Sequence, residues 1–408
     1  MRDIYVLGGY QTDFGVNWAK QDQGVFDILE TSVKGALAAT DLDPSDIDVA
    51  HVGNFAGELF TGQGHLGGLF GSLDPAFDGV PSVRHEAACA SGSMAALGAT
   101  AEIEAGRYDV AAVVGIEQMR NVSTPAAAEY LGSALWVGVE AVGEAFPWPA
   151  QFSEIADEYD RRYGLEYEHL MAIAEKAFDN AKRNPNAQSR SWQFEDDAFS
   201  DDDDLNPLVA GRIRKLDCAR ITDGAATVIL ASGEWAAEYA ARRGKQLEDI
   251  PRISGWGHRT TPMKLHDKLI GSRNDRYVFP HIRGTITDAW RRAGINGTAD
   301  LDAIETHDCF TITEYMAMDH FGITAPGESW KALDDRVTHL DGALPVNPSG
   351  GLIGSGHPVG ATGVRMLLDA HRQVTGTAGD YQVENAKRVQ TLNIGGSTTT
   401  IASFVVES

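Results

Sequence analysis

Apolar and polar positions alternate along the chain in blocks that predict strands and helices in turn. Short apolar runs that close on glycine, in residues 107–119 ("RYDVAAVVGIEQM") and 387–399 ("KRVQTLNIGGSTT"), predict buried strands. Residues 94–106 ("MAALGATAEIEAG") and 364–374 ("VRMLLDAHRQV") have the apolar spacing of helices. Strands that alternate with helices predict an α/β fold, with largely parallel sheets covered by helices.

The chain carries this pattern twice. Residues 39–60 and 293–315 both run from small residues through a loop and an Asp-x-Asp to an apolar strand and a polar turn. With one inserted residue, Asp46 aligns with Asp300 and Gly53 with His307. The two buried strand segments form a second matched pair, and residues 222–232 and 395–405 form a third, in the same order. Three matches in one order predict a duplicated α/β unit rather than a solenoid of short repeats.

One segment, residues 118–215, has no counterpart in the second half, and we interpret it as an inserted loop or lid domain. The first half then comprises residues 1–117 and 216–249, and the second half residues 250–408. The insertion contains four consecutive aspartates, Asp201 to Asp204. They lack the spaced ligands and the glycine of a calcium loop, so we expect a solvated surface.

Composition excludes several classes of partner. The 408 residues carry a formal net charge of −24, which opposes binding to nucleic acid or to an anionic membrane surface. No apolar stretch approaches the roughly 18 residues of a membrane span, and neither a secretory leader nor a terminal Ser-Lys-Leu is present, so we expect a cytoplasmic protein. Three cysteines cannot build a disulfide framework, so each thiol needs its own explanation.

Cys89 is the first candidate for chemistry. It stands in a run of small residues, "HEAACASGSM", directly before a predicted helix. Unpaired N–H groups at a helix N-terminus favour a thiolate, and small neighbours would let an acyl group approach. The alternative is a small buried core residue, and this segment alone leaves both interpretations open.

His357 is the second candidate. It lies among glycines in residues 347–367, "NPSGGLIGSGHPVGATGVRML", which predict a tight turn before a helix. The spacing differs from the G-x-G-x-x-G of a dinucleotide site. A histidine fixed by backbone turns suits a base that faces a thiol, whereas a hydrogen-bonded structural histidine is the alternative.

Residues 304–315, "IETHDCFTITEY", place a histidine, an aspartate and a cysteine side by side. If the segment before them is a strand, His307 and Cys309 point into the same space and Asp308 points away. His-x-Cys is too short to chelate zinc and has no partner motif, so we expect no metal site. Cys218 has no histidine near it in the sequence, so we interpret it as structural.

At these residues the chain resembles the thiolase superfamily. Cys89 in "ACASGS", His357 in "GSGHPVGATG" and the closing "NIGG" resemble three thiolase loops, and the duplication covers nearly the whole chain. Where classical thiolases have Asn-Glu-Ala-Phe this chain has "HDCF", as in sterol-carrier-protein-type thiolases. The classical C-terminal Cys-x-Gly is replaced by Asn393-Ile394-Gly395, so the acid/base thiol of that loop is missing.

The resemblance implies a five-layered αβαβα fold of two thiolase halves with an inserted loop domain. It implies thiolytic cleavage of 3-ketoacyl-CoA to acetyl-CoA and a shortened acyl-CoA, or the reverse Claisen condensation, through an acyl-enzyme on Cys89. His357 would be the base, Cys309 would replace the missing thiol, and His307 would bind the enolate oxygen. The N–H groups of Cys89 and Gly395 would bind the tetrahedral oxyanion.

The same resemblance implies no permanently bound cofactor, with coenzyme A and acyl-CoA as substrates, and an assembly that is a homodimer or a tetramer. Two alternatives remain. A ketosynthase-like condensing enzyme has the same fold, but a decarboxylating enzyme needs no acid/base thiol at Cys309. The chain could also be a thiolase-like subunit that acts with, or scaffolds, a small accessory protein.

Overall fold

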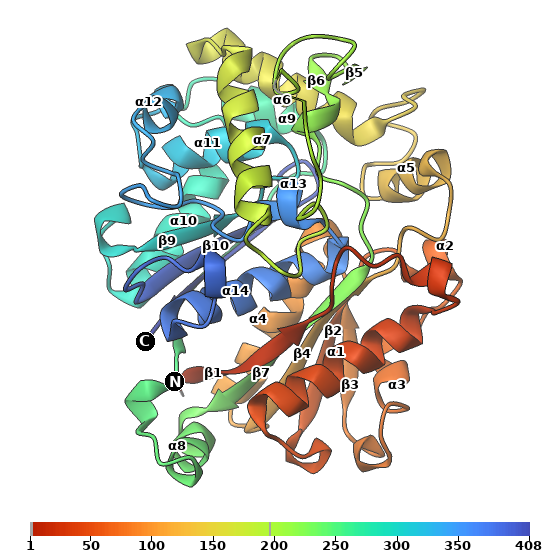
Figure 1. Cartoon of the computed structure of the whole chain (residues 1–408), viewed down its shortest axis with the longest axis vertical. Coiled ribbons are helices and arrows are strands. Elements are labelled where there is room, and N and C mark those ends of the chain that lie inside the picture. Colours follow the sequence, from red (N-terminus) through yellow and green to blue (C-terminus); the bar gives the residue numbers. More distant parts are fainter. Residues whose placement is uncertain (1–2, 196) are drawn as a thin grey trace.

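The computed structural model describes residues 3–195 and 197–408 and is built around one nine-stranded mixed sheet (Figure 1). Its strands lie in the order β3-β2-β4-β7-β1-β8-β11-β10-β9. Their bounds are β1 Ile4–Gln11, β2 Val49–Gly53, β3 Ser82–His85, β4 Val110–Glu117, β7 Gly224–Ser232, β8 Arg252–Thr260, β9 Ala303–Thr306, β10 Arg388–Gly395 and β11 Thr400–Glu407.

The strand order is nearly the same from both ends of the sheet. Apart from the additional edge strand β3, β2-β4-β7-β1 in the first half corresponds to β9-β10-β11-β8 in the second, and the halves meet where β1 pairs with β8. The segments that match in the sequence occupy corresponding places, with β2 opposite β9, β4 opposite β10 and β7 opposite β11. The internal duplication therefore predicted which strands are equivalent.

The two halves of the sheet, joined by only two pairs of described residues between β1 and β8, supply two layers, and helices supply the other three. The 14-residue helices α4 (Ser91–Glu104) and α14 (Thr362–Thr375) form the central layer, and α14 contacts strands of both halves, among them β7 and β10. Helix α1 (Val25–Thr40) covers the outer face of the first half, and α10 (Pro280–Ala293) covers that of the second (Figure 1). The αβαβα arrangement that the resemblance implied is confirmed.

Two backbone segments of the central layer approach so closely that only glycine fits. A Cβ atom on Gly92, in the first turn of α4, would lie 2.6 Å from the carbonyl oxygen of Gly360. A Cβ atom on Gly360 would lie 2.4 Å from the carbonyl oxygen of Ile116 at the end of β4. This contact joins the turns that precede α4 and α14, which carry Cys89 and His357.

Residues 118–215 form α5 (Thr124–Gly132), α6 (Pro147–Tyr163), α7 (Tyr167–Ala181) and the hairpin β5 (Leu208–Ala210) and β6 (Ile213–Arg214). Ile155 of α6 and Ile173 of α7 share a core with Ile312 of α11 (Thr311–Phe321), so this segment packs on the second half. Residues 201–204 are exposed, as predicted. Within the described ranges, no helix has both the length and the apolar character to cross a membrane.

The remaining helices are short. They are α2 Gly57–Thr61, α3 Leu66–Phe70, α8 Gly233–Arg242, α9 Leu265–Gly271, α12 Ser329–Asp334 and α13 Gly351–Ser355. Several of them pack on other helices: α12 lies on α7 and α11, and α13 lies on α7.

Candidate active site

Cys89 occupies a single 3-10 turn, η4 (Ala88–Ala90), that leads directly into α4. The preceding Ala88 has a left-handed backbone with φ of 50°. The Ser91 hydroxyl fixes this turn, because it accepts from the Ala87 N–H at 2.9 Å and donates to the Ala88 carbonyl at 2.6 Å. The short side chain of Ser91 thus shapes a tight turn that leaves the Cys89 sulfur on the wall of a cavity.

The Cys89 thiol is protonated at rest. Burial raises its pKa to about 12, although a hydrogen bond from the backbone N–H of Gly396 acts in the opposite direction. We expected the helix N-terminus to favour a thiolate, but desolvation outweighs that effect. Cys89 therefore needs a base that removes its proton as it attacks.

His357 offers a free nitrogen for that purpose. Its Nδ1 lies 2.7 Å from the Thr362 hydroxyl oxygen, and the Thr362 hydroxyl donates to the Pro358 carbonyl at 3.1 Å. Since the only hydroxyl hydrogen is used there, the oxygen accepts from His357 Nδ1–H, and Nε2 carries the lone pair. This Nε2 is buried without a hydrogen-bond partner among the described residues.

Two features keep His357 neutral and in place. Burial, together with the positive charge of Arg365, lowers its pKa to about 3. Its backbone N–H donates to the Thr222 hydroxyl at 2.9 Å, and Ile221 pairs with it in a parallel bridge. The glycine-rich turn before α14 thus holds a neutral imidazole in a fixed place, and its role as a base stays a prediction.

His307 directly follows β9 and has the opposite tautomer. The Asn393 side-chain amide donates to the Cys89 carbonyl at 3.1 Å and lies 3.2 Å from His307 Nδ1, while its oxygen accepts from Ser93 at 2.8 Å. An amide nitrogen can only donate, so His307 Nδ1 accepts and Nε2 carries the proton. Burial lowers the pKa of His307 well below its usual value, and His357 adds to this shift.

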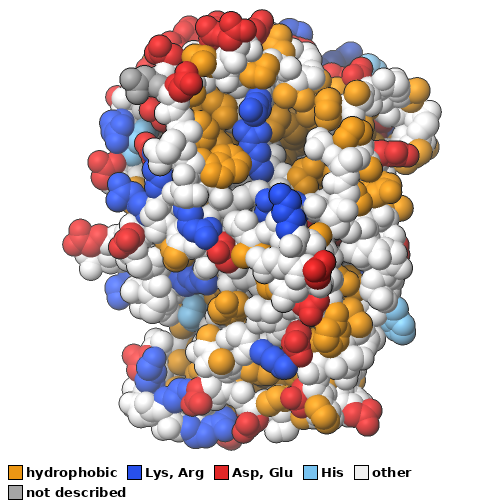
Figure 2. All heavy atoms as spheres, turned by 45° about the vertical axis from the view of Figure 1, so that its right-hand side comes forward, with side chains coloured by type: hydrophobic (Ala, Val, Ile, Leu, Met, Phe, Trp, Pro, Cys, Tyr) orange, Lys and Arg blue, Asp and Glu red, His pale blue; other side chains and the backbone are white. Residues whose placement is uncertain are grey.

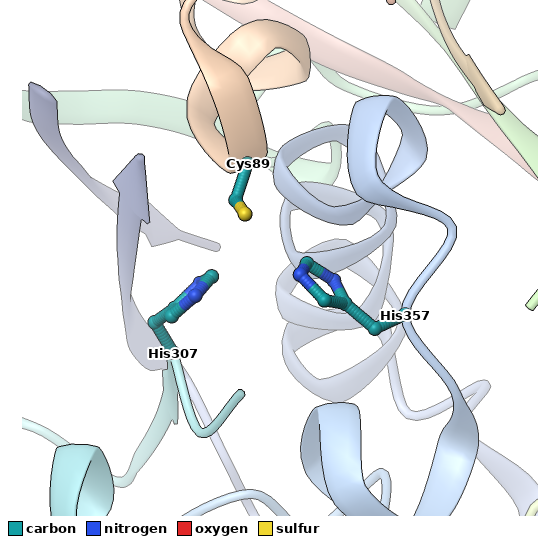
Figure 3. Close-up of side chains that lie close together, drawn as sticks. All are labelled: Cys89, His307 and His357. Carbon is teal, nitrogen blue, oxygen red and sulfur yellow. The ribbon is translucent and has the colours of Figure 1, made fainter. Parts of the chain in front are cut away.

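The two imidazoles and the sulfur lie together. Figure 3 shows both rings directed toward Cys89, one from the end of β9 and one from the turn before α14. The ring centres of His307 and His357 are 5.4 Å apart, and the rings are nearly perpendicular at 84°. Asn393, which sequence analysis noted only as the replacement for a missing thiol, therefore orients one of the site residues.

Asp308 and Cys309 point to different places, as expected, although β9 ends at Thr306 and the strand period does not extend to them. Asp308 accepts from the Leu352 N–H at 2.6 Å and so ties this segment to the turn that carries His357, and burial raises its pKa to about 8. Cys309 lines the same cavity as Cys89 and His357. Burial raises the pKa of Cys309 well above its usual value, so it is a neutral thiol.

The structure places Gly396, rather than Gly395, at the nucleophile. Gly396 lines the cavity and its N–H is directed to the Cys89 sulfur. Gly395 is the last residue of β10 and pairs with Thr400, and a Cβ atom there would lie 2.2 Å from the Ala87 carbonyl oxygen. The role of the Gly395 N–H as an oxyanion donor stays a prediction, and the neighbouring Gly396 N–H is a second candidate for that role.

The inner cavity has a volume of about 100 Å³ and largely apolar walls. Phe152 of the inserted segment stacks on Phe310, with ring centres 4.4 Å apart, and closes one side. An outer cavity of about 610 Å³ shares part of this wall. Figure 2 shows hydrophobic side chains gathered around a hollow in the upper half of the molecule, with Lys or Arg side chains among them.

Cys218 lines only the outer cavity, and its thiol donates to the Arg214 carbonyl at 3.3 Å. A structural role for it stays a prediction.

The ligand atoms of Cys89, His307 and His357 lie within 4.8 Å of one another, so these three could hold a soft cation. The expectation of no metal site therefore stays untested.

Together these groups supply what acyl transfer needs. A thiol stands beside an unpartnered basic nitrogen, an imidazole N–H and a backbone N–H are available for developing negative charge on oxygen, and a second neutral thiol faces the same small cavity. Covalent catalysis by an activated thiol with oxyanion stabilisation is the chemistry that fits this set.

Comparison with known proteins agrees with this chemistry. Residues 4–234 match the model of the thiolase N-terminal domain, and residues 264–408 match that of the thiolase C-terminal domain-like family. The acetyl-CoA acetyltransferase of Methanothermobacter thermautotrophicus is 33% identical over 410 residues, which cover 99% of each chain.

Two further relatives extend the comparison. Human sterol carrier protein 2 is 27% identical over 406 residues, which cover 97% of this chain and 70% of that protein. The solved structure of the Ltp2-ChsH2(DUF35) aldolase superposes with a TM-score of 0.75 at 18% identity, over all of this chain and 98% of that one, and shows the shared fold. The chain belongs to the thiolase family.

Proposed function

We propose that this protein is a thiolase-type acyltransferase that cleaves 3-ketoacyl-CoA with coenzyme A, or runs the reverse Claisen condensation, through an acyl-enzyme on Cys89. The observation that carries the proposal is the pairing of a neutral thiol with the unpartnered, buried Nε2 of His357. Coenzyme A is a substrate here, and no step needs a permanently bound cofactor.

The first step forms the acyl-enzyme. His357 Nε2 takes the proton from Cys89 as the sulfur attacks the 3-keto carbonyl carbon. The resulting oxyanion lies between the N–H groups of Cys89 and Gly396, and loss of one such donor typically costs about 3 to 4 kcal/mol of transition-state stabilisation. Gly395, the donor expected from the sequence, is one residue away from this position.

The second step breaks the carbon–carbon bond. The departing enolate of acetyl-CoA accepts a hydrogen bond from His307 Nε2–H on its oxygen and a proton from Cys309 on its carbon. Free coenzyme A then enters, its thiol proton returns to Cys309, and its sulfur attacks the acyl-enzyme. As Cys89 leaves, it recovers its proton from His357, so every group ends as it began.

The test is thiolysis of acetoacetyl-CoA by coenzyme A, followed as loss of the 3-keto thioester. We expect turnover by the natural protein and none by Cys89→Ala. Cys309→Ala should still form an acetyl adduct on Cys89 when given acetyl-CoA, as seen by intact mass, but should lose exchange of the acetyl methyl hydrogens with solvent. Turnover only with malonyl-CoA present would instead support a ketosynthase-like condensing enzyme.

We further propose a homodimer. Strand β3 lies at one end of the sheet, and its Val83 side chain is 46% exposed. Unpaired edge strands tend to pair with another chain, and β3 leads directly into the turn that carries Cys89. Light scattering at micromolar concentration should give twice the mass of the chain. A monomer would contradict the proposal, and four times the mass would indicate a tetramer.

The alternative function is that of a subunit that depends on a partner protein. The observation that favours it is an exposed apolar segment after α5, in which Val137 is 73% and Val142 is 71% exposed. The aldolase superposed above has two named components, but its low identity shows the fold alone. Thiolysis by the purified chain would exclude an absolute need for a partner.

A further inference from the structure

The two cavities at the candidate active site differ in charge from the rest of the molecule. The chain has a net charge of −24, yet none of the described residues that line the inner or the outer cavity is an aspartate or a glutamate. The charged residues on these walls are Lys215, which faces the outer cavity, and Arg220, which lines both. The route to Cys89 is therefore locally cationic.

Arg220 is partly exposed and lacks the ion pairs that the buried Arg365 makes. Arg365 contacts Glu305 at 3.0 Å and Asp369 at 2.9 Å. Arg220 has no hydrogen bond or ion pair from its guanidinium to any described residue; its Nε is buried without a partner, and its one ring contact is with Trp192 at 5.7 Å. Burial without a counter-ion lowers its pKa. Partial desolvation of a cation that has no counter-ion is costly, and a substrate oxyanion would relieve that cost.

Building on the proposed function, we propose that Arg220 binds a carboxylate on the acyl group, so that the preferred substrates are 3-ketoacyl-CoA thioesters whose acyl chain ends in a second acid. Arg220 is suited to this because its planar guanidinium binds a carboxylate through two parallel hydrogen bonds. Its place on the wall shared by both cavities puts it beside the space that a short chain on Cys89 would fill.

The phosphates of coenzyme A are the other source of an oxyanion for Arg220. They lie far from the coenzyme A sulfur, whereas Arg220 lies near Cys89, so the distance does not fit them. A long arm with two amide groups separates the sulfur of coenzyme A from its nearest phosphate. Arg220 lines the same cavity of about 100 Å³ as Cys89. The carboxylate of a short dicarboxylic chain lies only a few bonds from the thioester carbon, which matches this proximity.

The experiment compares 3-oxoadipyl-CoA with 3-oxohexanoyl-CoA, which have equal numbers of acyl carbons but end in a carboxylate and a methyl group. We expect the natural protein to cleave the acidic substrate with a kcat/KM about 10- to 100-fold higher, the range typical of a hydrogen bond to a charged group. Arg220→Gln should abolish this preference by slowing the acidic substrate alone. Arg220→Lys should keep part of it, and the exposed control Arg291→Gln should keep all of it.

A second measurement does not need carbon–carbon cleavage. The rates at which succinyl-CoA and butyryl-CoA acylate Cys89, followed by intact mass, should show the same preference and the same loss in Arg220→Gln. Cleavage of 3-oxohexanoyl-CoA without any preference for the acid would overturn this proposal and leave the proposed function standing. An equal rise of KM for both substrates in Arg220→Gln would assign Arg220 to coenzyme A and also overturn it. If neither substrate is cleaved, the proposed function fails. The acid preference is then tested separately, because equal rates of Cys89 acylation by succinyl-CoA and butyryl-CoA would overturn it.

Discussion

The end of β9 and the turn before α14 each bring one histidine to Cys89, and the two are prepared in opposite ways. His357 donates a hydrogen bond from Nδ1–H to Thr362 and presents an unprotonated Nε2, whereas His307 accepts at Nδ1 from Asn393 and presents Nε2–H. Burial keeps both neutral. The neighbour behind each ring thus sets which nitrogen carries the proton, and the proposed roles of base and donor follow from that tautomer.

The two halves of the duplication also use equivalent strand ends differently. Gly53, the position in the first half that corresponds to His307, ends β2, and a Cβ atom there would lie 2.6 Å from the Cα of Gly92 in α4. The first half therefore uses that strand end to seat the nucleophile helix, and the second half uses it to hold an imidazole. One scaffold carries the thiol in one copy and both histidines in the other.

The largest expected effect follows removal of the base. His357→Ala should lower the rate of Cys89 acylation by acetyl-CoA by up to about 10⁴-fold, because the thiol then has no proton acceptor within the site. Stopped reactions analysed by intact mass would measure it. Added imidazole should restore part of the rate. The exposed histidine control His258→Ala should stay within about twofold, and acylation at the natural rate in His357→Ala would contradict the assignment.

The second histidine should give a different loss. His307→Ala should lower kcat for acetoacetyl-CoA thiolysis by about 10²-fold, the usual effect of losing one oxyanion donor. His307→Asn should recover much of this, because an amide N–H can donate from a similar position. Added imidazole should not help, since no proton acceptor is missing. Equal rescue of the two histidine variants by imidazole would show that their roles are not distinct.

These roles were only partly predictable from the sequence. The duplication predicted the equivalent strands, and the loops around Cys89 and His357 were conspicuous because each concentrates small residues and glycines directly before a helix. The tautomers were hidden, because they depend on contacts between residues far apart in the chain, such as Ser93 and Asn393, separated by 300 positions. That the Gly396 N–H is directed to the Cys89 sulfur was also hidden, because it depends on how the turn after β10 packs on the Cys89 turn.

A smaller effect is expected from the residue that sets one tautomer. Asn393→Ala should lower kcat by about tenfold and leave KM nearly unchanged, because His307 can then adopt the other tautomer and lose its donor part of the time. Asn393→Asp should be more damaging than Asn393→Ala, since a carboxylate accepts from Nδ1–H and enforces the wrong tautomer. Nitrogen chemical shifts of His307 would report the tautomer directly, and an unchanged tautomer in Asn393→Asp would refute the argument.

The smallest effect is expected in the pH dependence of the rate. This dependence distinguishes a resting site with a neutral thiol and a neutral imidazole from one with a thiolate and an imidazolium. The pKa of His357 is lowered to about 3, so the ring gains a proton only in strong acid, and that of Cys89 is raised to about 12, so the thiol loses its proton only in strong base. Between pH 6 and pH 9 neither group changes charge. Asp308, whose pKa is raised to about 8, accepts from the Leu352 N–H and does not face the sulfur, so the rate of Cys89 acetylation by acetyl-CoA should vary by less than about threefold. Acetylation is the right half-reaction, because free coenzyme A, whose own thiol titrates in this range, is not a reactant in it. A steep rise of the rate with increasing pH would show that a thiol of the resting enzyme loses its proton in this range. A fall of the rate below pH 7 would show that a histidine gains a proton there. Either result would mean that the proton leaves Cys89 before the attack rather than during it.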